Sequence, residues 1–303
     1  MARRLPPAWD RSVRELGKAA LNYRGARAAL RRRALFSAVG RYSPLLLASF
    51  GRGWLLVDAN DKEVGRVVYA TGGYERVYME SALQALSSTE WSVRSKTFLD
   101  IGANIGTSTV DALMHFGFER AICFEPDTRN LKLLEVNLRL NDLHDRASVH
   151  PVALSDSDGY ALLERTAGNF GDTRVVSFSS HREGYGVRCR RLDDLVASKD
   201  VLLEDLGLVW IDVQGHEPFV LSGAEAVIRE GIPTVIEYSP GALRSTGGLD
   251  LLESLIRSHY QRIVDVRLLA HGLASSATLD AADVVRLRDR YDAWDHTDLL
   301  LLR

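Results

Sequence analysis

The sequence has few of the residues that mark specialised structural classes. It contains only 2 Cys and 8 Pro in 303 residues, with 46% apolar and 26% charged residues. This composition argues against a disulfide-stapled, a fibrous and an intrinsically disordered chain. The two cysteines, Cys123 and Cys189, do not have a metal-ligand spacing, so a reducing cytoplasm is the expected setting. The length suffices for one large core with an appended subdomain.

The sequence also lacks long hydrophobic runs. The stretch 45–50 is too short to cross a membrane and is flanked by Arg41 and Arg52. The N-terminal segment has no sustained apolar region and no small-residue cleavage site, which argues against a signal peptide. These observations lead us to expect a cytoplasmic protein.

The formal net charge of −2 conceals a basic N-terminal segment. Residues 1–45 contain only Asp10 and Glu15 as acids, against Arg3, Arg4, Arg11, Arg14, Lys18, Arg24, Arg27, Arg31, Arg32, Arg33 and Arg41. The simpler interpretation is a solvated helical face or a dimerisation arm, which would make a homo-oligomer. Contact with nucleic acid or with an anionic membrane surface is the alternative.

The patterning predicts two regions. Residues 1–75 are expected to form a basic helical segment to about residue 45 and a β-hairpin whose strands, 54–57 and 64–69, flank Asn60 and Asp61. This extension would serve substrate selection, as a lid, or dimerisation. Residues 76–303 are expected to form an α/β domain with a doubly wound parallel sheet. Its first helix is expected at 78–86, and a glycine-rich inserted loop or hairpin at about 158–190.

The expected core elements alternate along the second region. Strands are predicted at 97–101, 121–125, 147–152, 208–212, 233–238, 260–266 and 297–302, and helices between them at 108–116, 128–141 and 217–230.

A glycine-rich turn follows the first predicted core strand. Asp100 ends an apolar run, and Gly102, Ala103, Asn104, Ile105 and Gly106 follow it before Thr107 begins a helix. Glu125, followed by Pro126, ends the next strand, where a carboxylate accepts hydrogen bonds from ribose hydroxyls. A dinucleotide fingerprint needs glycine where Asn104 stands, so a pyrophosphate cradle is not apparent. S-adenosylmethionine, which has a ribose and a cationic centre but no phosphates, fits the pattern better. A purely structural turn is the alternative.

Further polar residues end later strands. Asp212 follows the fourth strand, at the edge where ligands of open α/β sheets bind, and His216 and Glu217 begin the next helix. Asp212 would face the reacting methyl group, and either Asp212 or His216 would be the general base, with Glu237 orienting it. Helix capping by Asp212, a structural His216 and a paired Glu237 at the sheet rim remain alternatives.

The end of the third predicted strand is expected to lie near the adenine of the cofactor. The segment Val152-Ala153-Leu154-Ser155-Asp156 follows the third predicted strand, and an amide near Leu154 together with Asp156 is expected to bind adenine.

Several motifs in one order resemble the FkbM-type S-adenosylmethionine-dependent methyltransferases. The resemblance covers roughly residues 75–240. It rests on Asp-Ile-Gly-Ala-Asn-Ile-Gly at 100–106, Phe-Glu-Pro at 124–126, Asn137 with Asn141-Asp142-Leu143, Ala-Leu-Ser-Asp at 153–156, Leu-Asp-Asp-Leu at 192–195, Ile-Asp-Val-Gln-Gly-His-Glu at 211–217 and Ile236-Glu237.

This resemblance implies a class I methyltransferase fold, a seven-stranded Rossmann-like sheet of order 3-2-1-4-5-7-6 whose last strand is antiparallel. It also implies O-methylation of a hydroxyl on a sugar, a lipid-linked glycan or a secondary metabolite. Gln214 departs from the family, which more often carries Glu there, so catalysis could be altered. Residues 1–70 lie outside the match.

Three other functions remain open at this point. A nucleic-acid methyltransferase would use the basic N-terminus, but the chain lacks an Asn/Asp-Pro-Pro-Tyr/Phe motif and a Pro-Cys nucleophile. A nicotinamide oxidoreductase is disfavoured by Asn104. A non-catalytic cofactor-binding protein is disfavoured by the carboxylates at 100, 125 and 212. The sequence indicates no metal and leaves open whether a divalent ion assists.

Overall fold

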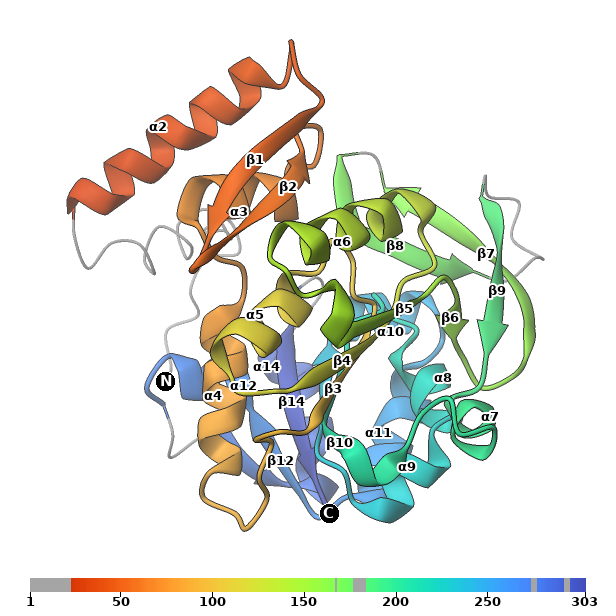
Figure 1. The fold of residues 1–303 in the computed structure, drawn as a ribbon. Coiled ribbons are helices and arrows are strands. Elements are labelled where there is room, and N and C mark those ends of the chain that lie inside the picture. The colour runs from red at the N-terminus through yellow and green to blue at the C-terminus, as the bar shows by residue number, and fades with distance from the viewer. Residues whose placement is uncertain (1–22, 167, 177–183, 274–276, 292–294) are drawn as a thin grey trace. The chain divides into compact units, whose positions relative to one another are not determined.

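The structure is a computed structural model that describes residues 23–166, 168–176, 184–273, 277–291 and 295–303 (Figure 1). The chain divides into two compact units, Met1–Tyr74 and Glu75–Arg303. Residues 1–22 of the basic helical segment predicted to about residue 45 lie outside the described residues.

The described part of the first unit contains a helix pair and a hairpin. Its elements are α2 (Tyr23–Val39), β1 (Leu45–Phe50), β2 (Gly53–Asp58) and α3 (Val64–Thr71). Strands β1 and β2 pair antiparallel around Gly51, whose φ is 56°. Helix α3 contacts both strands and α2, and the rings of Phe36 and Tyr69 lie 5.4 Å apart between the two helices.

The hairpin predicted for residues 54–69 is wrong in its second half, because residues 64–71 form helix α3. Val64, Val67 and Val68 are all buried and recur at helical spacing, which favours a helix in spite of their β-branched side chains. Asp61 accepts hydrogen bonds from the amides of Glu63 and Gly65 and so supports the start of this helix. The partner of β2 is β1, the short apolar run before it.

The second unit contains an eight-stranded sheet of order β13-β12-β14-β11-β10-β3-β4-β5. Its strands are β3 (Thr97–Ile101), β4 (Arg120–Phe124), β5 (Ala147–His150), β10 (Leu206–Ile211), β11 (Thr234–Tyr238), β12 (Arg262–Asp265), β13 (Thr278–Asp280) and β14 (Thr297–Leu302). Strand β14 is antiparallel to β11 and β12, whereas β5, β4, β3, β10 and β11 pair parallel in succession. The predicted doubly wound α/β fold is confirmed.

Seven of these strands follow the order 3-2-1-4-5-7-6 that the resemblance implied. The predicted strand count is wrong by one, because β13 pairs antiparallel with β12 and covers its outer edge. Such a short strand blunts an edge whose backbone groups would otherwise be unpaired. Its sequence, Thr-Leu-Asp, has no β signal strong enough to predict it.

Helices lie on both faces of the sheet (Figure 1). They are α4 (Arg76–Leu86), α5 (Thr107–His115), α6 (Thr128–Leu140), α7 (Leu192–Ala197), α8 (Glu217–Ser222), α9 (Glu225–Glu230), α10 (Pro240–Ser245), α11 (Leu249–His259), α12 (Val266–Ala270) and α14 (Leu287–Arg290), with 3₁₀ turns η1 (His144–Arg146), η2 (Leu203–Asp205) and η3 (Ala281–Arg286). Helix α4 contacts α5 and α12, and α11 contacts α8 and α10. The sheet between them is apolar, and every residue of β3, β10, β11 and β14 is buried.

The single helix predicted for 217–230 is two helices, α8 and α9, separated at Gly223. A Cβ at Gly223 would lie 2.1 Å from the carbonyl oxygen of Ser155. The close approach of the backbone at Ser155 therefore requires glycine at this position, and the helix is interrupted there.

The glycine-rich region predicted as an inserted loop or hairpin forms a second sheet of order β6-β9-β7-β8. Its strands are β6 (Ala153–Leu154), β7 (Gly159–Thr166), β8 (Asn169–Val176) and β9 (Tyr185–Arg190). The hairpin of β7 and β8 is antiparallel, while β6 pairs parallel with β9. Leu163, Val187 and Cys189 form a small core of their own with Ala153.

Candidate active site

The glycine turn after β3 lies against the end of β10. Gly102 has a φ of 90°, and a Cβ on it would lie 1.9 Å from the carbonyl oxygen of Asp212. Only glycine is compatible with both the conformation and this approach. The amide of Asp212 also donates to the carbonyl of Ile101, at 3.0 Å. The backbone of the predicted cofactor turn is therefore in direct contact with the backbone of Asp212, the residue predicted to face the reacting methyl group.

Glu125, at the end of β4, is held by two backbone amides. Its Oε2 accepts from the amide of Asn104, and its Oε1 from the amide of Asp127, both at 2.7 Å. Burial raises the pKa of this carboxyl to about 8, against the effect of the two amide donors. Each carboxylate oxygen keeps a further lone-pair direction for a ligand hydroxyl.

Helices α5 and α6 support the turn. Asn137 on α6 donates to the carbonyl of Ile105 at 2.8 Å, and Thr107 begins α5 directly after Gly106, whose φ is 91°. Asn104 has a left-handed φ of 51°, and its Oδ1 is buried without a hydrogen-bond partner. An orphaned buried acceptor of this kind is suited to a ligand amine or ammonium.

Asp100 lies deeper than expected for a ligand-contacting residue. It is buried, and its Oδ2 accepts from the hydroxyl of Thr109 at 2.5 Å. Burial raises the pKa of Asp100 to about 7. The Thr109 hydroxyl also lies 3.2 Å from the Cys123 sulfur. The hydroxyl has one proton, which it donates in its hydrogen bond to Asp100. In the contact with Cys123 the thiol is therefore the donor.

The second sheet is tied to this edge by Arg165. Its guanidinium donates to both oxygens of Asp127, at 2.5 and 3.0 Å, and lies 4.4 Å from the centre of the Tyr185 ring. Asp127 is buried and also caps α6 through the amides of Arg129 and Asn130. Arg165 therefore links the inserted sheet to Asp127, which follows Glu125 by two residues in the chain.

Three carboxylates meet beside the ends of β10 and β11. Asp212, Glu217 and Glu237 each offer an oxygen within 4.8 Å of the others, which could hold a hard cation such as Mg²⁺. One nitrogen, Nε2 of Gln214, donates to Oδ1 of Asp212 at 2.6 Å and to Oε2 of Glu237 at 3.0 Å. Glu237 is also 4.0 Å from Nε2 of His296 on the segment before β14.

Burial dominates the electrostatics of this cluster. It raises the pKa of Glu237 well above the ordinary value, and the negative charges of Asp212, Glu217, Asp298 and Glu75 raise it further. Burial also raises the pKa of Glu217, whose Oε1 accepts from the amides of Val213 and Gly215. Within the described residues, neither glutamate forms an ion pair with Lys or Arg. Glu237 therefore keeps its proton to a higher pH than an exposed glutamate does.

His216 points to the neighbouring segment after β6. Its Nε2 lies 3.0 Å from the Ser155 hydroxyl, and its ring stacks on Phe219 with centres 4.8 Å apart. Burial lowers the pKa of His216 to about 4, so its ring is neutral near pH 7. The three-carboxylate cluster does not include it.

The residues predicted to bind adenine are split between surface and core. Asp156 is exposed and accepts from the hydroxyls of Ser155 and Ser157. The side chain of Leu154 belongs to the main core cluster. Pro126, after Glu125, is partly exposed at the edge of the cofactor turn, and Ile105 is buried.

Comparison with known proteins identifies the family. Residues 100–262 match the family described as the methyltransferase FkbM domain, which is more than half of the chain. The chain belongs to the FkbM methyltransferase family. It is 30% identical over 177 residues to the 2-O-methyltransferase NoeI of Sinorhizobium fredii, a match that covers 52% of this chain and 70% of that protein.

Distant solved structures resemble this FkbM methyltransferase. The FkbM methyltransferase of Methylobacillus flagellatus is 20% identical with a TM-score of 0.44, over 90% of this chain and 59% of that one. An O-methyltransferase from Bacillus cereus, determined in complex with SAH, is 13% identical with a TM-score of 0.37, over 89% of this chain and 100% of that one. The chain thus spans less than two thirds of the length of the first.

Two motifs of the FkbM resemblance have visible structural uses. Asn137 supports the cofactor turn, as described above. Asp193, in the motif at 192–195, accepts from the amides of Glu225 and Ala226 at the start of α9. Sequence reasoning missed the contacts of Thr109, Asp127, Arg165 and Gln214. Of these, only Gln214 lay in a motif that had been singled out.

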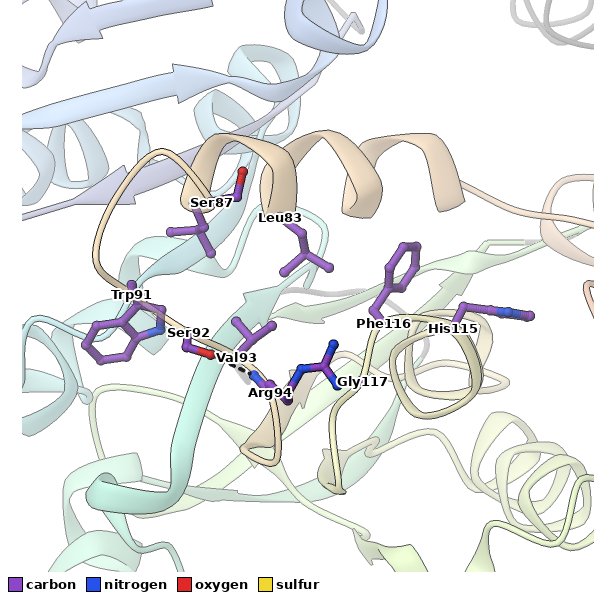
Figure 2. A pocket seen from close by; sticks show the side chains of 10 residues that line it. Leu83, Ser87, Trp91, Ser92, Val93, Arg94, His115, Phe116 and Gly117 are labelled. Carbon is purple, nitrogen blue, oxygen red and sulfur yellow. Dashed lines mark hydrogen bonds between the residues drawn. The ribbon is translucent and has the colours of Figure 1, made fainter.

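A cavity of about 450 Å³ lies elsewhere in this FkbM enzyme. It is lined by α4, the segment before β3 and the end of α5, through residues that include Leu83, Trp91, Arg94, His115 and Phe116 (Figure 2). These segments are at the amino ends of the strands, and the predicted site residues do not line it. Among the described residues, no helix has both the length and the apolar character needed to span a membrane.

Proposed function

We propose that the protein is an S-adenosylmethionine-dependent O-methyltransferase that acts on a hydroxyl of a sugar, a lipid-linked glycan or a secondary metabolite. The observation that carries this proposal is the backbone contact between the Gly102 turn and Asp212. A cofactor held by that turn and Glu125 would bring its reactive group beside a carboxylate at the end of the neighbouring strand.

The residues of the cofactor edge fit S-adenosylmethionine. Glu125, fixed by two amides, would accept hydrogen bonds from two ribose hydroxyls. The orphaned Oδ1 of Asn104 would accept from the ammonium of the methionine portion. Asp156 and the backbone near Leu154 would meet the adenine. Gly102, Gly106 and Thr107 supply the turn, but the position of Asn104 lacks the glycine that a pyrophosphate needs.

When bound, S-adenosylmethionine supplies an electrophilic methyl group on a sulfonium. The oxygen of the acceptor hydroxyl would bond to the methyl carbon while the bond from that carbon to sulfur breaks. Asp212 would accept the proton that the hydroxyl loses. A positioned base contributes about two to four orders of magnitude, and alignment of the reactants contributes more. Glu237 would hold Asp212 through Gln214, whose amide donates to both carboxyls.

The oxygen acceptor is supported by the relative named a 2-O-methyltransferase. A carbohydrate acceptor also suits the cluster, because hydroxyl groups donate to carboxylates. The basic residues of 1–45, which would serve membrane contact, nucleic-acid binding or dimerisation, lie partly outside the described residues.

Isothermal calorimetry of S-adenosylmethionine and NAD on the full chain tests the cofactor. We expect S-adenosylmethionine to bind and NAD not to bind. Glu125→Ala should weaken the binding about 100-fold, because two hydrogen bonds to the ribose hydroxyls are lost. The matched control is Glu119→Ala, an exposed glutamate before the same strand, which should bind as the wild type does.

Methyl transfer is then measured with methyl-labelled cofactor on a panel of free and lipid-linked sugars, with an RNA and a DNA oligonucleotide alongside. Label on a sugar oxygen would support the proposal. Preference for NAD, or label on the nucleic acids alone, would overturn it.

A further inference from the structure

Gln214 connects two acidic side chains that would otherwise repel. Its amide nitrogen has two protons, and the geometry uses them for Asp212 at 2.6 Å and Glu237 at 3.0 Å. Asp212 comes from the end of β10 and Glu237 from β11, so this one side chain links the ends of neighbouring strands. The link does not depend on the cofactor turn.

The backbone aims this amide. Gln214 has a left-handed φ of 56°, which is uncommon for a residue other than glycine. The amides on either side of it, those of Val213 and Gly215, both donate to Oε1 of Glu217, at 3.1 and 3.0 Å. Glu217 is buried, so these two bonds are shielded from water and fix the loop. Gly215 has a φ of 99°, and a Cβ on it would lie 3.0 Å from the carbonyl oxygen of Ala242, so the loop is closely packed on that side.

We propose that Gln214 is a positioning residue for methyl transfer, whose amide clamps Asp212 and Glu237 in the arrangement that the reaction uses. This inference rests on the proposed function, and it assigns a role to a side chain that does not itself accept a proton. An isosteric Glu at this position would remove both donors and add a fourth carboxylate to the three already present. Asp212 would then be repelled from its orientation, while the cofactor turn would keep its own contacts.

The test compares Gln214→Glu with Gln84→Glu, which makes the same chemical change at an exposed position of α4. For Gln214→Glu we expect kcat to fall roughly 10- to 100-fold, since charge-assisted hydrogen bonds are lost. The KM of the sugar acceptor and the Kd of SAH should stay within about threefold of the wild type, as for an interaction that matters mainly in the transition state. Gln84→Glu should leave all three constants unchanged.

Two kinetic outcomes would overturn the proposal: a kcat of Gln214→Glu within about twofold of the wild type, or a loss that is matched by a loss of SAH binding. A second measurement does not need an acceptor. The chain has three glutamines, Gln84, Gln214 and Gln261, so their side-chain amides give few signals in a ¹⁵N spectrum. The Gln214 amide protons should exchange more slowly with water than the other two pairs. Equal exchange rates would disprove the clamp even if the protein proves to be a methyltransferase.

Discussion

Glu125 and Glu237 are two buried carboxyls at the same edge of one sheet, but they are held in different ways. Glu125 accepts from two backbone amides, those of Asn104 and Asp127. Glu237 accepts from the side chain of Gln214 and lies near His296. Burial raises the pKa of both. The cofactor edge, which is the turn after β3 with Glu125, is thus held by backbone amides. The reaction edge, which is Asp212 with Glu237, is held by a side chain that a substitution can change.

This difference bears on how each edge tolerates substitution. Only substitution by proline removes a backbone N–H, and every other residue donates there, so its partner must remain an acceptor. A side-chain donor can be changed together with its partner. We therefore expect the cofactor edge to be sensitive in folding and binding, and the reaction edge to be sensitive mainly in turnover.

The largest effect is expected from Asp212→Asn. The amide cannot accept the hydroxyl proton, so turnover should fall by about two to four orders of magnitude. The Kd of SAH should change little, because the contact of Gly102 is with the backbone of Asp212. Labelled methyl transfer and calorimetry measure the two effects. The control is Asp205→Asn, an exposed carboxyl at the other end of β10, and wild-type turnover in Asp212→Asn would remove Asp212 from its role.

Glu125→Gln and Glu237→Gln test the comparison directly. At Glu125 both oxygens face amide donors, so the new NH₂ group must meet one of them, at a cost of about 1–3 kcal/mol. At Glu237 the new carbonyl can accept from Gln214 while the NH₂ turns toward His296. Thermal unfolding should show a clear loss of Tm for Glu125→Gln and little loss for Glu237→Gln, and equal losses would contradict the distinction.

The cofactor edge also predicts how stability depends on pH. Asp100 and Glu125 have pKa values raised to about 7 and about 8, so the folded chain retains protons that the unfolded chain releases above pH 4–5. Stability should therefore be greatest at the acidic end of this window and fall as pH rises to about 8. We expect a Tm several degrees higher at pH 5.5 than at pH 8.5, with each pKa unit worth about 1.4 kcal/mol.

Asp100→Asn isolates one contribution to this slope. Asparagine resembles the protonated aspartic acid in shape, and its oxygen still accepts from Thr109. The Tm of this variant should depend less steeply on pH than that of the wild type. An unchanged slope would show that Asp100 titrates near its ordinary value in the folded chain.

The smallest effect is expected from His216→Ala. The ring contacts Ser155 and Phe219 and does not belong to the carboxylate cluster. Its loss should cost about 1 kcal/mol of stability and leave kcat within about fivefold of the wild type. A loss of turnover as large as that of Asp212→Asn would return the role of base to His216.

The strand ends could be predicted because parallel strands share one edge. The segments that form β3, β4, β10 and β11 read as apolar runs with an acidic residue at or just after the carboxyl end. This pattern placed Asp100, Glu125, Asp212 and Glu237 at the carboxyl edge of the sheet. The pattern did not show that Asp100 accepts from Thr109 in the interior, because that contact depends on how α5 packs against β3.

Other features depend on contacts that a short sequence window does not contain. The valines of α3 read equally well as a strand, and the helix is favoured by the hydrogen bonds that Asp61 accepts from the amides of Glu63 and Gly65. The two-residue strand β6 exists only because β9 returns beside it. The clamp of Gln214 requires a left-handed backbone and a partner 23 residues away.

The inserted sheet enters and leaves the main domain at one place. The amide of Ser155, where the insertion begins, donates to the carbonyl of Arg190, where it ends, at 3.0 Å. Closing a longer or shorter excursion between fixed, adjacent ends changes the chain entropy only slowly with length. The insertion is thus closed at its base, so a change in its length need not shift the register of any strand of the main sheet. The contact of Arg165 with Asp127 is the part of the insertion that such a change would have to keep.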